Sequence, residues 1–296
     1  MNSKVAICLT SHDRLDCTLI NQEIFKLNFS HPYIVIHASS GAKATRYLDD
    51  AFVHCKPLPH FAGAVSLMKN AVKAALQFEP DFIVVLDGDT WLLEEKALWK
   101  FIQCLQENPR LLMATCAWMP LPHRFIHRVL MEFTEIVNIP VNRFSRFISL
   151  PRRVFYDALD FSTQFLIMRN YKPAVDLFLS LSPDDPRLIE RQWFDLFSTH
   201  FSLNRVLRMK EREPVHPNHR FVCEQLGLHS EHWPAAETST DPRNEKEIDF
   251  VKPGTPGKRE ALEKYPNIRK GKFIQKLLNS ATNEDLAYYN TSAKRY

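Results

Sequence analysis

Residues 82–92, FIVVLDGDTWL, contain a run of apolar residues followed by two aspartates one residue apart. The run 82–86 is rich in β-branched and aromatic residues without polar alternation, which is typical of a strand buried on both faces of a sheet. Asp87 and Asp89 then follow at its carboxyl end. Ligands of open α/β sheets bind at that end, and paired carboxylates there favour a divalent cation. A plain Asp-Gly turn is the alternative.

The composition predicts a folded chain with a large core. The chain has 296 residues, of which 45% are hydrophobic. Its apolar runs are too short to span a bilayer, and residues 1–10 do not resemble a secretory signal, so we expect a cytoplasmic protein. The cysteines form no CxxC pair and are expected to be reduced core thiols rather than disulfides or zinc ligands. They are Cys8, Cys17, Cys55, Cys104, Cys116 and Cys223.

The positive charge is concentrated in one segment. The formal net charge is +4, and residues 119–156 hold six arginines against two acidic residues, with phenylalanines between them. One hypothesis is that this segment contacts an anionic acceptor or, peripherally, the inner face of an acidic membrane. The alternative is that the arginine stems cover hydrophobic surface with their charged ends in water. No nucleic-acid motif accompanies the segment, so no nucleic-acid partner is expected.

The first 118 residues alternate strand and helix patterns. Strands are predicted at 5–10, 33–37, 52–55, 82–86 and 111–118, and helices at 14–29 and 63–78 and around 98–105. The core positions of the helices are expected to be Leu15, Leu19, Ile20, Ile24 and Leu27, then Val65, Met68, Val72, Ala75 and Leu76, then Leu98, Phe101, Ile102 and Leu105. This order predicts an α/β fold with a mostly parallel sheet and helices on both faces.

The second half of the chain is less regular. Residues 163–170 predict a strand, 185–201 a helix with Asp185 as N-cap and Pro186 in its first turn, and 205–209 an edge strand. We expect one domain over 1–233, made of halves 1–118 and 119–233. Residues 234–296 contain many charges, with Pro and Gly at 253–257, and are expected to form a flexible loop and a helical tail.

Three segments resemble a known family. LTSHDR (9–14), AGAVSLMKN (62–70) and VVLDGDT (84–90) follow one another in that order. Together they resemble the nucleotide-sugar half of a GT-A glycosyltransferase, most like the broad family 2 type, over residues 4–118 and more loosely over 160–232. The resemblance implies a Rossmann-like GT-A fold and metal-dependent transfer of a sugar from a nucleoside diphosphate donor, a UDP-sugar being favoured. The acceptor would be a hydroxyl of a glycan, a lipid-linked molecule or a protein, and an inverting mechanism is expected.

The resemblance also implies roles for single residues. Thr10, Ser11 and Arg14 match the polar turn that holds the base and the ribose of the donor. Asp87 and Asp89 match the DxD element, in which the first aspartate faces the ribose or a metal-bound water and the second binds Mn²⁺ or Mg²⁺ directly. A hard cation suits oxygen ligands and stabilises the departing diphosphate.

One position departs from the family. Its second strand commonly ends in an aspartate that binds the base, whereas here IVIHASSG supplies His37, Ser39 and Ser40. The identity of the base is therefore left open. His12 and His60 are expected in loops at the same edge of the sheet, where they contact either the donor or solvent.

A histidine near the end of the domain completes the metal site in many members of the family. His216, His229 and His232 are the candidates here. We favour His229 or His232, because LGLHSEHW comes immediately before the expected loop from residue 234, which would close over the donor as a lid.

Inverting members also need a carboxylate that takes the proton of the acceptor hydroxyl. In the family this carboxylate stands near the start of the helix after the acceptor-binding strand. The predicted helix 185–201 occupies that place, with Glu190 and Asp195 as candidates and Asp184 or Asp185 as the alternative. Trp193, on the same helix, either stacks on a sugar or lies in the core.

Three rival functions use the same aspartates. A haloacid-dehalogenase-type phosphatase resembles DxDGT, whereas the order here is DGDTW. A nucleotidyltransferase would use the same cation, but the Gly- and Arg-rich loop expected after its first strand is absent. A non-catalytic nucleotide-sugar-binding module would have little reason to hold two carboxylates so close together.

Overall fold

The computed structural model describes the backbone of the strands and helices predicted for the first half and of part of the second half. The described residues are 3–12, 15–42, 44–88, 90–92, 95–116, 163, 165–201, 205–209, 228–230, 270–272 and 275. Within them, the side chains of 15–17, 60, 91, 97, 116, 208–209 and 228–230 are not described. The segment 119–156, the expected boundary at 233 and most of the expected loop and tail lie outside these ranges.

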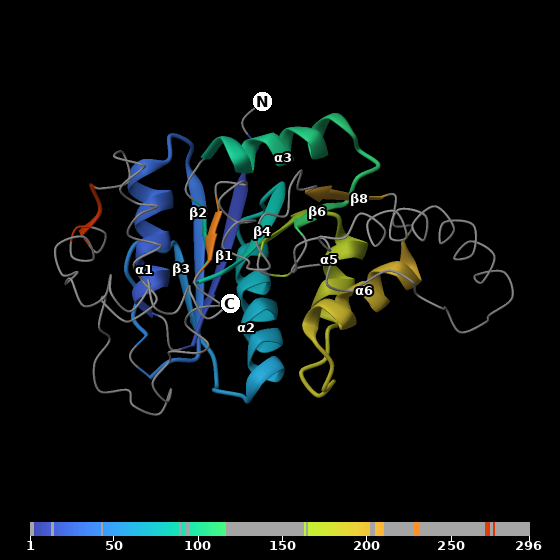
Figure 1. Cartoon of the computed structure of the whole chain (residues 1–296), viewed down its shortest axis with the longest axis horizontal. Coiled ribbons are helices and arrows are strands. Elements are labelled where there is room, and N and C mark those ends of the chain that lie inside the picture. The colour runs from blue at the N-terminus through green and yellow to red at the C-terminus, as the bar shows by residue number, and fades with distance from the viewer. Residues whose placement is uncertain are drawn as a thin grey trace, which may run out of the picture.

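A mixed, mostly parallel sheet forms the centre of the molecule (Figure 1). Its seven strands follow the order β3-β2-β1-β4-β7-β6-β8. β1 to β4 are mutually parallel, β7 is antiparallel to both of its neighbours, and β8 is parallel to β6 at the edge. The strands are β1 (Val5–Ser11), β2 (Tyr33–Ser39), β3 (Ala51–His54), β4 (Phe82–Asp87), β6 (Met113–Cys116), β7 (Phe165–Arg169) and β8 (Val206–Met209). The predicted α/β fold and edge strand are confirmed.

Helices cover both faces of this sheet, as the alternating sequence predicted (Figure 1). One face packs against α2 (His60–Leu76), α5 (Lys172–Leu179) and α6 (Ile189–His200). The other packs against α1 (Leu15–Glu23), its π-helical continuation η1 (Ile24–Asn28) and α3 (Glu95–Glu107). A separate two-stranded sheet pairs β5 (Thr90–Leu92) with β9 (Leu228–Ser230).

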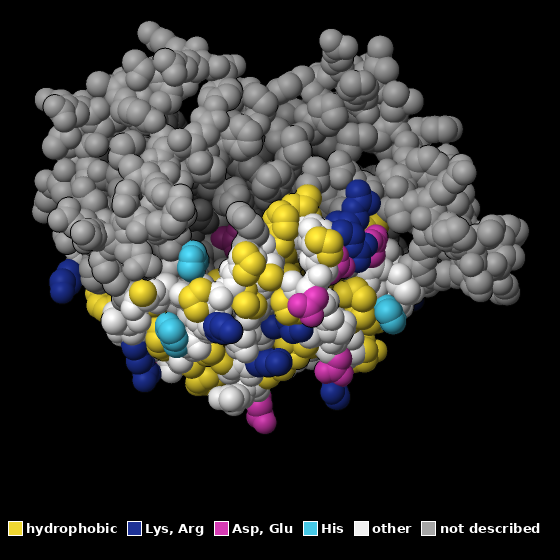
Figure 2. Space-filling view, turned by 90° about the horizontal axis from the view of Figure 1, so that it is seen from below, with side chains coloured by type: hydrophobic (Ala, Val, Ile, Leu, Met, Phe, Trp, Pro, Cys, Tyr) yellow, Lys and Arg dark blue, Asp and Glu magenta, His cyan; other side chains and the backbone are white. Residues whose placement is uncertain are grey.

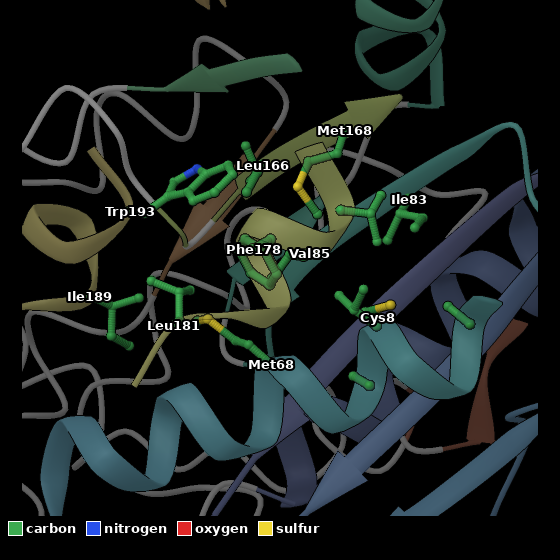
Figure 3. Close-up of a cluster of buried hydrophobic side chains, with 14 of the residues drawn as sticks. Cys8, Met68, Ile83, Val85, Leu166, Met168, Phe178, Leu181, Ile189 and Trp193 are labelled. Atoms are coloured by element: carbon green, nitrogen blue, oxygen red, sulfur yellow. The ribbon is translucent and has the colours of Figure 1, made fainter. Parts of the chain in front are cut away.

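The strand β4 is buried on both faces, as its unbroken apolar sequence predicted. Ile83 and Val85 belong to the cluster under α2, α5 and α6, shown in Figure 3. Phe82, Val84 and Leu86 belong to the cluster under α1 and α3. Successive side chains of a strand point to opposite faces, so a strand covered by helices on both sides is apolar along its length, and here the first polar residue is Asp87 at its end.

Trp193 is a core residue. Its side chain has no exposed surface, and its ring lies 5.1 Å from that of Phe178 in an edge-on arrangement. Figure 3 shows both residues in the cluster between α5, α6 and the sheet. The structure therefore favours the core interpretation over stacking on a sugar.

Two helix predictions were wrong. Leu27 was expected in the core, but its side chain is 48% exposed. The chain changes to a π-helix at Ile24, and the wider turn rotates Leu27 away from the face that Ile20 occupies. Asp185 was expected to cap α6, but α6 begins at Ile189, and Asp185 accepts the backbone N–H and guanidinium bonds of Arg187 in the turn before it.

The thiols of Cys8, Cys55 and Cys104 are free, and burial raises the pKa of the Cys8 thiol. Among the described helices, none is long and apolar enough to cross a membrane. Residues 270–272 lie against α1, where a Cβ on Gly271 would come within 2.2 Å of Glu23 Oε2. Figure 1 shows this short segment in red beside α1.

The packing in Figure 3 predicts a large effect of truncating Phe178, which is fully buried against Trp193. Phe178→Ala should lower the free energy of unfolding by about 3–5 kcal/mol, because it removes apolar burial and leaves a cavity. Urea denaturation measures the change. The matched control is Phe61→Ala on α2, where the ring is 40% exposed and the expected cost is about 0.5 kcal/mol. Equal losses in the two variants would contradict the placement of α5.

Candidate active site

The carboxyl ends of β1, β2 and β4 bring several predicted site residues to one edge of the sheet. Parallel pairing sets Thr10 opposite Asp87, and Ser11 opposite Ser39. Thr10 Oγ1 donates to Asp87 Oδ1 over 3.4 Å. Three of the four residues predicted to bind the donor, Thr10, Ser11 and Asp87, therefore lie together. Arg14 and Asp89 lie outside the described residues.

Helix α1 holds the Asp-Gly-Asp turn through a buried amide. Asn21 Nδ2 donates to the backbone oxygen atoms of Gly88, at 2.9 Å, and Thr90, at 3.0 Å. The turn also packs tightly, because a Cβ on Gly88 would lie 2.2 Å from Thr18 Oγ1 and 2.5 Å from the carbonyl oxygen of Thr10. Only glycine fits between α1 and β1 at this point.

A second buried amide of α1 contacts the end of β2. Gln22 Nε2 lies 3.3 Å from His37 Nδ1, and His37 Nε2 lies 2.8 Å from Ser11 Oγ. Ser11 Oγ is in turn 3.0 Å from Ser39 Oγ. Burial lowers the pKa of His37 to about 4, so the ring is neutral at pH 7. Asn21 and Gln22 were not among the predicted site residues. Their signal was polar side chains next to the apolar face of a helix.

The turns that follow β1 and β2 touch each other. His12 Nδ1 lies 2.9 Å from Ser40 Oγ, and the backbone N–H of Ser40 donates to the carbonyl oxygen of Ser11 over 3.1 Å. A Cβ on Gly41 would come within 2.2 Å of the carbonyl oxygen of His12. His12 thus lies at the expected edge. His60 is the first residue of α2, and its side chain is not described.

Glu190 lies at the same edge of the sheet, on the first turn of α6. Its Oε1 accepts a hydrogen bond of 2.9 Å from Thr163 Oγ1, and both side chains are buried. β7 runs antiparallel to β4 with Phe165 opposite Leu86, so residues just before β7 lie beside residues just after β4. Thr163 therefore brings Glu190 toward the Asp-Gly-Asp turn.

The other candidate bases have different surroundings. The Asp195 side chain is 35% exposed, and its Oδ2 accepts from Arg187 Nη1 over 2.7 Å. Asp184 is exposed. Hydrogen bonds from Arg187 lower the pKa of Asp185 and occupy its carboxylate. Of the four carboxylates, Glu190 is the one that lies buried beside the Asp87 edge.

The short sheet β5-β9 brings a histidine segment beside the same turn. Thr90 pairs with Ser230, and Trp91 pairs with His229, in antiparallel register. The backbone of His229 therefore lies next to the residues that follow Asp89. The His229 side chain is not described, and His216 and His232 lie outside the described residues.

The Asp87 carboxylate at the end of β4 is an oxygen ligand of the kind that suits a hard cation. Asn21 Oδ1 and Thr90 Oγ1 are buried atoms without a hydrogen-bond partner in the structure. Oxygen ligands are those that Mg²⁺ and Mn²⁺ prefer. The part of the chain that the structure describes contains no cluster of three or more His, Cys, Asp and Glu residues able to hold a metal. Asp89, which the sequence predicts as the direct ligand, is outside that part.

Figure 2 views the molecule from the side where α2 begins, which is the side of the carboxyl ends of β1 to β4. Basic, acidic and hydrophobic side chains are interspersed on the described part of this face. The positively charged segment predicted from the sequence, 119–156, is not among the described residues, so the hypothesis of a membrane contact stays untested.

A surface pocket of about 570 Å³ lies at the opposite edge of the sheet, where β2 and α3 begin. It is lined by His31, Glu95, Lys96, Trp99, Lys100, Gln103 and Gln106. Glu95 accepts hydrogen bonds from the backbone N–H groups of Ser30 and His31, both at 2.9 Å, and from the Tyr33 hydroxyl at 3.0 Å. Burial alone would raise the pKa of Glu95, but these N–H groups and the Ser30 and His31 side chains hold it at about 2. The carboxylate thus ties α3 to the start of β2.

Comparison with known proteins gives similar structures only. No family model and no curated protein matches this chain. A glycosyltransferase involved in the glycosylation of the major capsid of PBCV-1 has 13% identity and a TM-score of 0.39, covering 70% of this chain and 82% of that one. A mannosyltransferase from Pyrobaculum calidifontis, in complex with GDP-Man and Mn²⁺, has 11% identity and a TM-score of 0.39, covering 99% and 80%. CMP:2-keto-3-deoxy-manno-octonic acid synthetase complexed with CTP has 11% identity and a TM-score of 0.38, covering 76% and 97%.

The low pKa of Glu95 predicts a stability change with pH. A carboxylate whose pKa falls from an ordinary 4.5 to about 2 on folding stabilises the fold above pH 4.5, and this contribution is lost as pH falls toward 2. Glu95→Gln should therefore lower the melting temperature most at pH 7, and the difference from wild type should shrink between pH 4.5 and 3.

Thermal unfolding at a series of pH values measures this difference. Glu107→Gln, which changes an exposed acid at the end of the same helix, is the control and should change little at any pH. A deficit of Glu95→Gln that stays constant from pH 7 to pH 3 would contradict the assignment.

Proposed function

We propose that this protein is a glycosyltransferase that moves a sugar from a nucleoside diphosphate donor, a UDP-sugar being favoured, to an acceptor hydroxyl. The observation that carries the proposal is that Asp87 and Glu190, which come from different halves of the chain, lie at one edge of the sheet. The residues expected to hold the donor, Thr10 and Ser11, line the same edge. The resemblance of LTSHDR, AGAVSLMKN and VVLDGDT to the GT-A family supports it.

Transfer of a sugar leaves a nucleoside diphosphate, whose negative charge grows as the bond to the sugar breaks. A bound Mn²⁺ or Mg²⁺ would neutralise that charge. Asp89 would bind the cation directly, and Asp87 would face the ribose or a metal-bound water. His229 or His232 would complete the site, which is supported by the pairing of β9 with the strand that follows Asp89. Asn21 supports this arrangement, because it fixes the backbone of the turn.

Glu190 is our candidate for the base of an inverting reaction. It would take the proton of the acceptor hydroxyl as that oxygen attacks the sugar carbon. Its hydrogen bond with Thr163 orients one carboxylate oxygen and leaves the other for the acceptor. Asp195 is less suited, because its carboxylate is bound to Arg187. The acceptor is proposed to be a hydroxyl of a glycan, a lipid-linked molecule or a protein.

The rival functions would use the same residues but release different products. A nucleotidyltransferase would transfer a nucleotide from a nucleoside triphosphate onto a sugar phosphate and release diphosphate, whereas a glycosyltransferase releases a nucleoside diphosphate. A phosphatase of the haloacid-dehalogenase type would need Asp87 as nucleophile, so Asp87→Asn would abolish phosphate release. A binding module would retain donor affinity without turnover. Product analysis by mass spectrometry therefore separates the four.

The metal assignment predicts that a nucleoside diphosphate stabilises the protein only with a divalent cation. UDP with Mn²⁺ should raise the melting temperature of the wild type, because a ligand that binds only the native state stabilises it by mass action. Asp89→Asn should lose this shift and keep the melting temperature of the free protein. His229→Ala and His232→Ala should distinguish the two histidines, since only substitution of the histidine that binds the metal should reduce the shift in melting temperature. An Asp89→Asn variant that binds as tightly as wild type would refute the site.

The base assignment predicts unequal effects of two substitutions on one helix. Glu190→Gln should slow glycosyl transfer by about a hundredfold or more, the usual scale for general-base catalysis, while donor affinity remains. Asp195→Asn is the matched control on the exposed side of α6 and should keep a near-normal rate. Transfer rates and donor binding are measured separately. Near-normal transfer by Glu190→Gln would exclude Glu190 and return attention to Asp184, Asp185 or a retaining mechanism.

A further inference from the structure

A continuous chain of hydrogen bonds runs from α1 to the ends of β1 and β2. Gln22 Nε2 lies 3.3 Å from His37 Nδ1, His37 Nε2 lies 2.8 Å from Ser11 Oγ, and Ser11 Oγ lies 3.0 Å from Ser39 Oγ. All four side chains are buried. Amides, neutral imidazoles and hydroxyls can each donate and accept, so the chain has two possible directions.

The backbone of Leu48 decides the direction. Its N–H can only donate, and it donates to Gln22 Oε1 over 2.8 Å. The other end of this amide, Nε2, is therefore the donor that faces His37. His37 Nδ1 must accept this bond. Because burial keeps the ring neutral at pH 7, its single proton is on Nε2.

The remaining bonds follow from this tautomer. His37 Nε2–H donates to Ser11 Oγ, and the Ser11 hydroxyl then donates to Ser39 Oγ. Ser39 Oγ also accepts the backbone N–H of Gly41 over 3.2 Å. Both acceptor positions of Ser39 are thus filled, and among the described residues no acceptor takes its own proton. A buried donor without an acceptor costs about 1–3 kcal/mol, so an acceptor atom of a bound ligand would stabilise the Ser39 hydroxyl.

We propose that Gln22 and His37 are positioning residues that orient Ser11 and Ser39 so that the Ser39 hydroxyl donates to an acceptor atom of the donor's nucleotide base. This inference rests on the proposed function, which places a nucleotide at the ends of β1 and β2. Gln22 and His37 do not touch the ligand themselves. They select the base by fixing which way the hydroxyl protons point.

The consequence is a preference between pyrimidines. Uracil carries a donor at ring position 3 and an acceptor at position 4, and cytosine carries the reverse. A Ser39 hydroxyl that donates toward one of these positions can pair with the base that has an acceptor there, but not with the base that has a donor there. A donor facing a donor leaves both unpaired, and a mismatch of about 1.4 kcal/mol is a tenfold difference in affinity.

Gln22→Glu reverses the chain without removing a side chain. The carboxylate can still accept from Leu48 but cannot donate to His37. At pH 8.5, where a neutral ring is favoured, His37 Nδ1 must then carry the proton and donate to Glu, and His37 Nε2 must accept from Ser11. Ser39 would then donate to Ser11 and offer a lone pair to the ligand instead of a proton.

Two measurements at pH 8.5 test the proposal. Nitrogen-15 NMR should show His37 protonated on Nε2 in the wild type and on Nδ1 in Gln22→Glu. Calorimetric titration with UDP and with CDP, each with Mg²⁺, should show that the ratio of the two Kd values changes by about tenfold or more between wild type and variant. Gln103→Glu, which adds the same charge on the exposed side of α3, is the control and should keep both the tautomer and the ratio.

The outcomes separate the proposal from the function on which it rests. A wild-type His37 protonated on Nδ1 overturns the direction of the chain, whatever binds. A reversed tautomer with a Kd ratio unchanged within twofold overturns the role in base selection. If the tautomers are as expected but neither UDP nor CDP binds the wild type, the proposed function fails and the ligand of Ser39 fails with it.

A second pair of variants serves if Gln22→Glu does not fold. His37→Gln retains an amide N–H that can donate to Ser11, whereas His37→Leu has no donor. The proposal expects His37→Gln to keep the wild-type ratio of UDP to CDP affinity, and His37→Leu to lose about tenfold of it. Equal ratios in both variants would overturn the proposal, because a merely space-filling role does not distinguish a donor from an alkyl group.

Discussion

The parallel pairing of β1 with both β2 and β4 is the constraint on which the site depends. It sets Thr10 opposite Asp87 and Ser11 opposite Ser39, so the polar ends of three buried strands meet at one edge. Shifting the pairing by one residue would turn every side chain of β1 to the opposite face of the sheet. The apolar residues of β1 belong alternately to the two core clusters, so burial holds the register. The position of the polar residues is thus a consequence of core packing.

Helix α1 reinforces this edge with neutral groups. Asn21 and Gln22 are fully buried. Asn21 joins α1 to the Asp-Gly-Asp turn, and Gln22 joins α1 to His37 and to the backbone of Leu48. A buried amide needs hydrogen bonds but no counter-ion, whereas a buried charge costs several kcal/mol unless it is paired. A neutral anchor is also compatible with a cation and a diphosphate close by, since it adds no charge that would compete with either.

Much of the fold could be predicted from the sequence because it follows from burial. The unbroken apolar run of β4 indicated cover on both faces, and the helical spacing of Leu98, Phe101, Ile102 and Leu105 correctly gave the buried face of α3. Local backbone choices were not predictable in this way. Hydrophobic periodicity does not reveal the π-helix that exposes Leu27. It also does not reveal the contact with Arg187 that replaces the expected capping role of Asp185.

The candidate site was predictable to the same extent. Asp87 could be placed at the edge because the carboxyl ends of parallel strands follow from the order of the elements, whereas Thr10 and Ser11 were predicted from the resemblance to the GT-A family. Asn21 and Gln22 were missed, because the polar run 21–23 on a helix suggests a solvent-exposed segment until the neighbouring strand ends are known. Gln22 contacts Leu48, 26 positions away in sequence, and Asn21 contacts Gly88, 67 positions away. Contacts over such separations cannot be inferred from the helix alone.

The sheet order also brings residues from the two halves of the chain to one edge. Glu190 and Asp195 are about 140° apart around a helix, so periodicity shows that only one can face the site but not which one. Strand β7 lies antiparallel beside β4 and brings Thr163 next to the end of the central strand. Thr163 binds Glu190, while Arg187 holds Asp195 on the other side. An antiparallel strand from the second half is therefore what carries a carboxylate of α6 to the edge where the first half places Asp87.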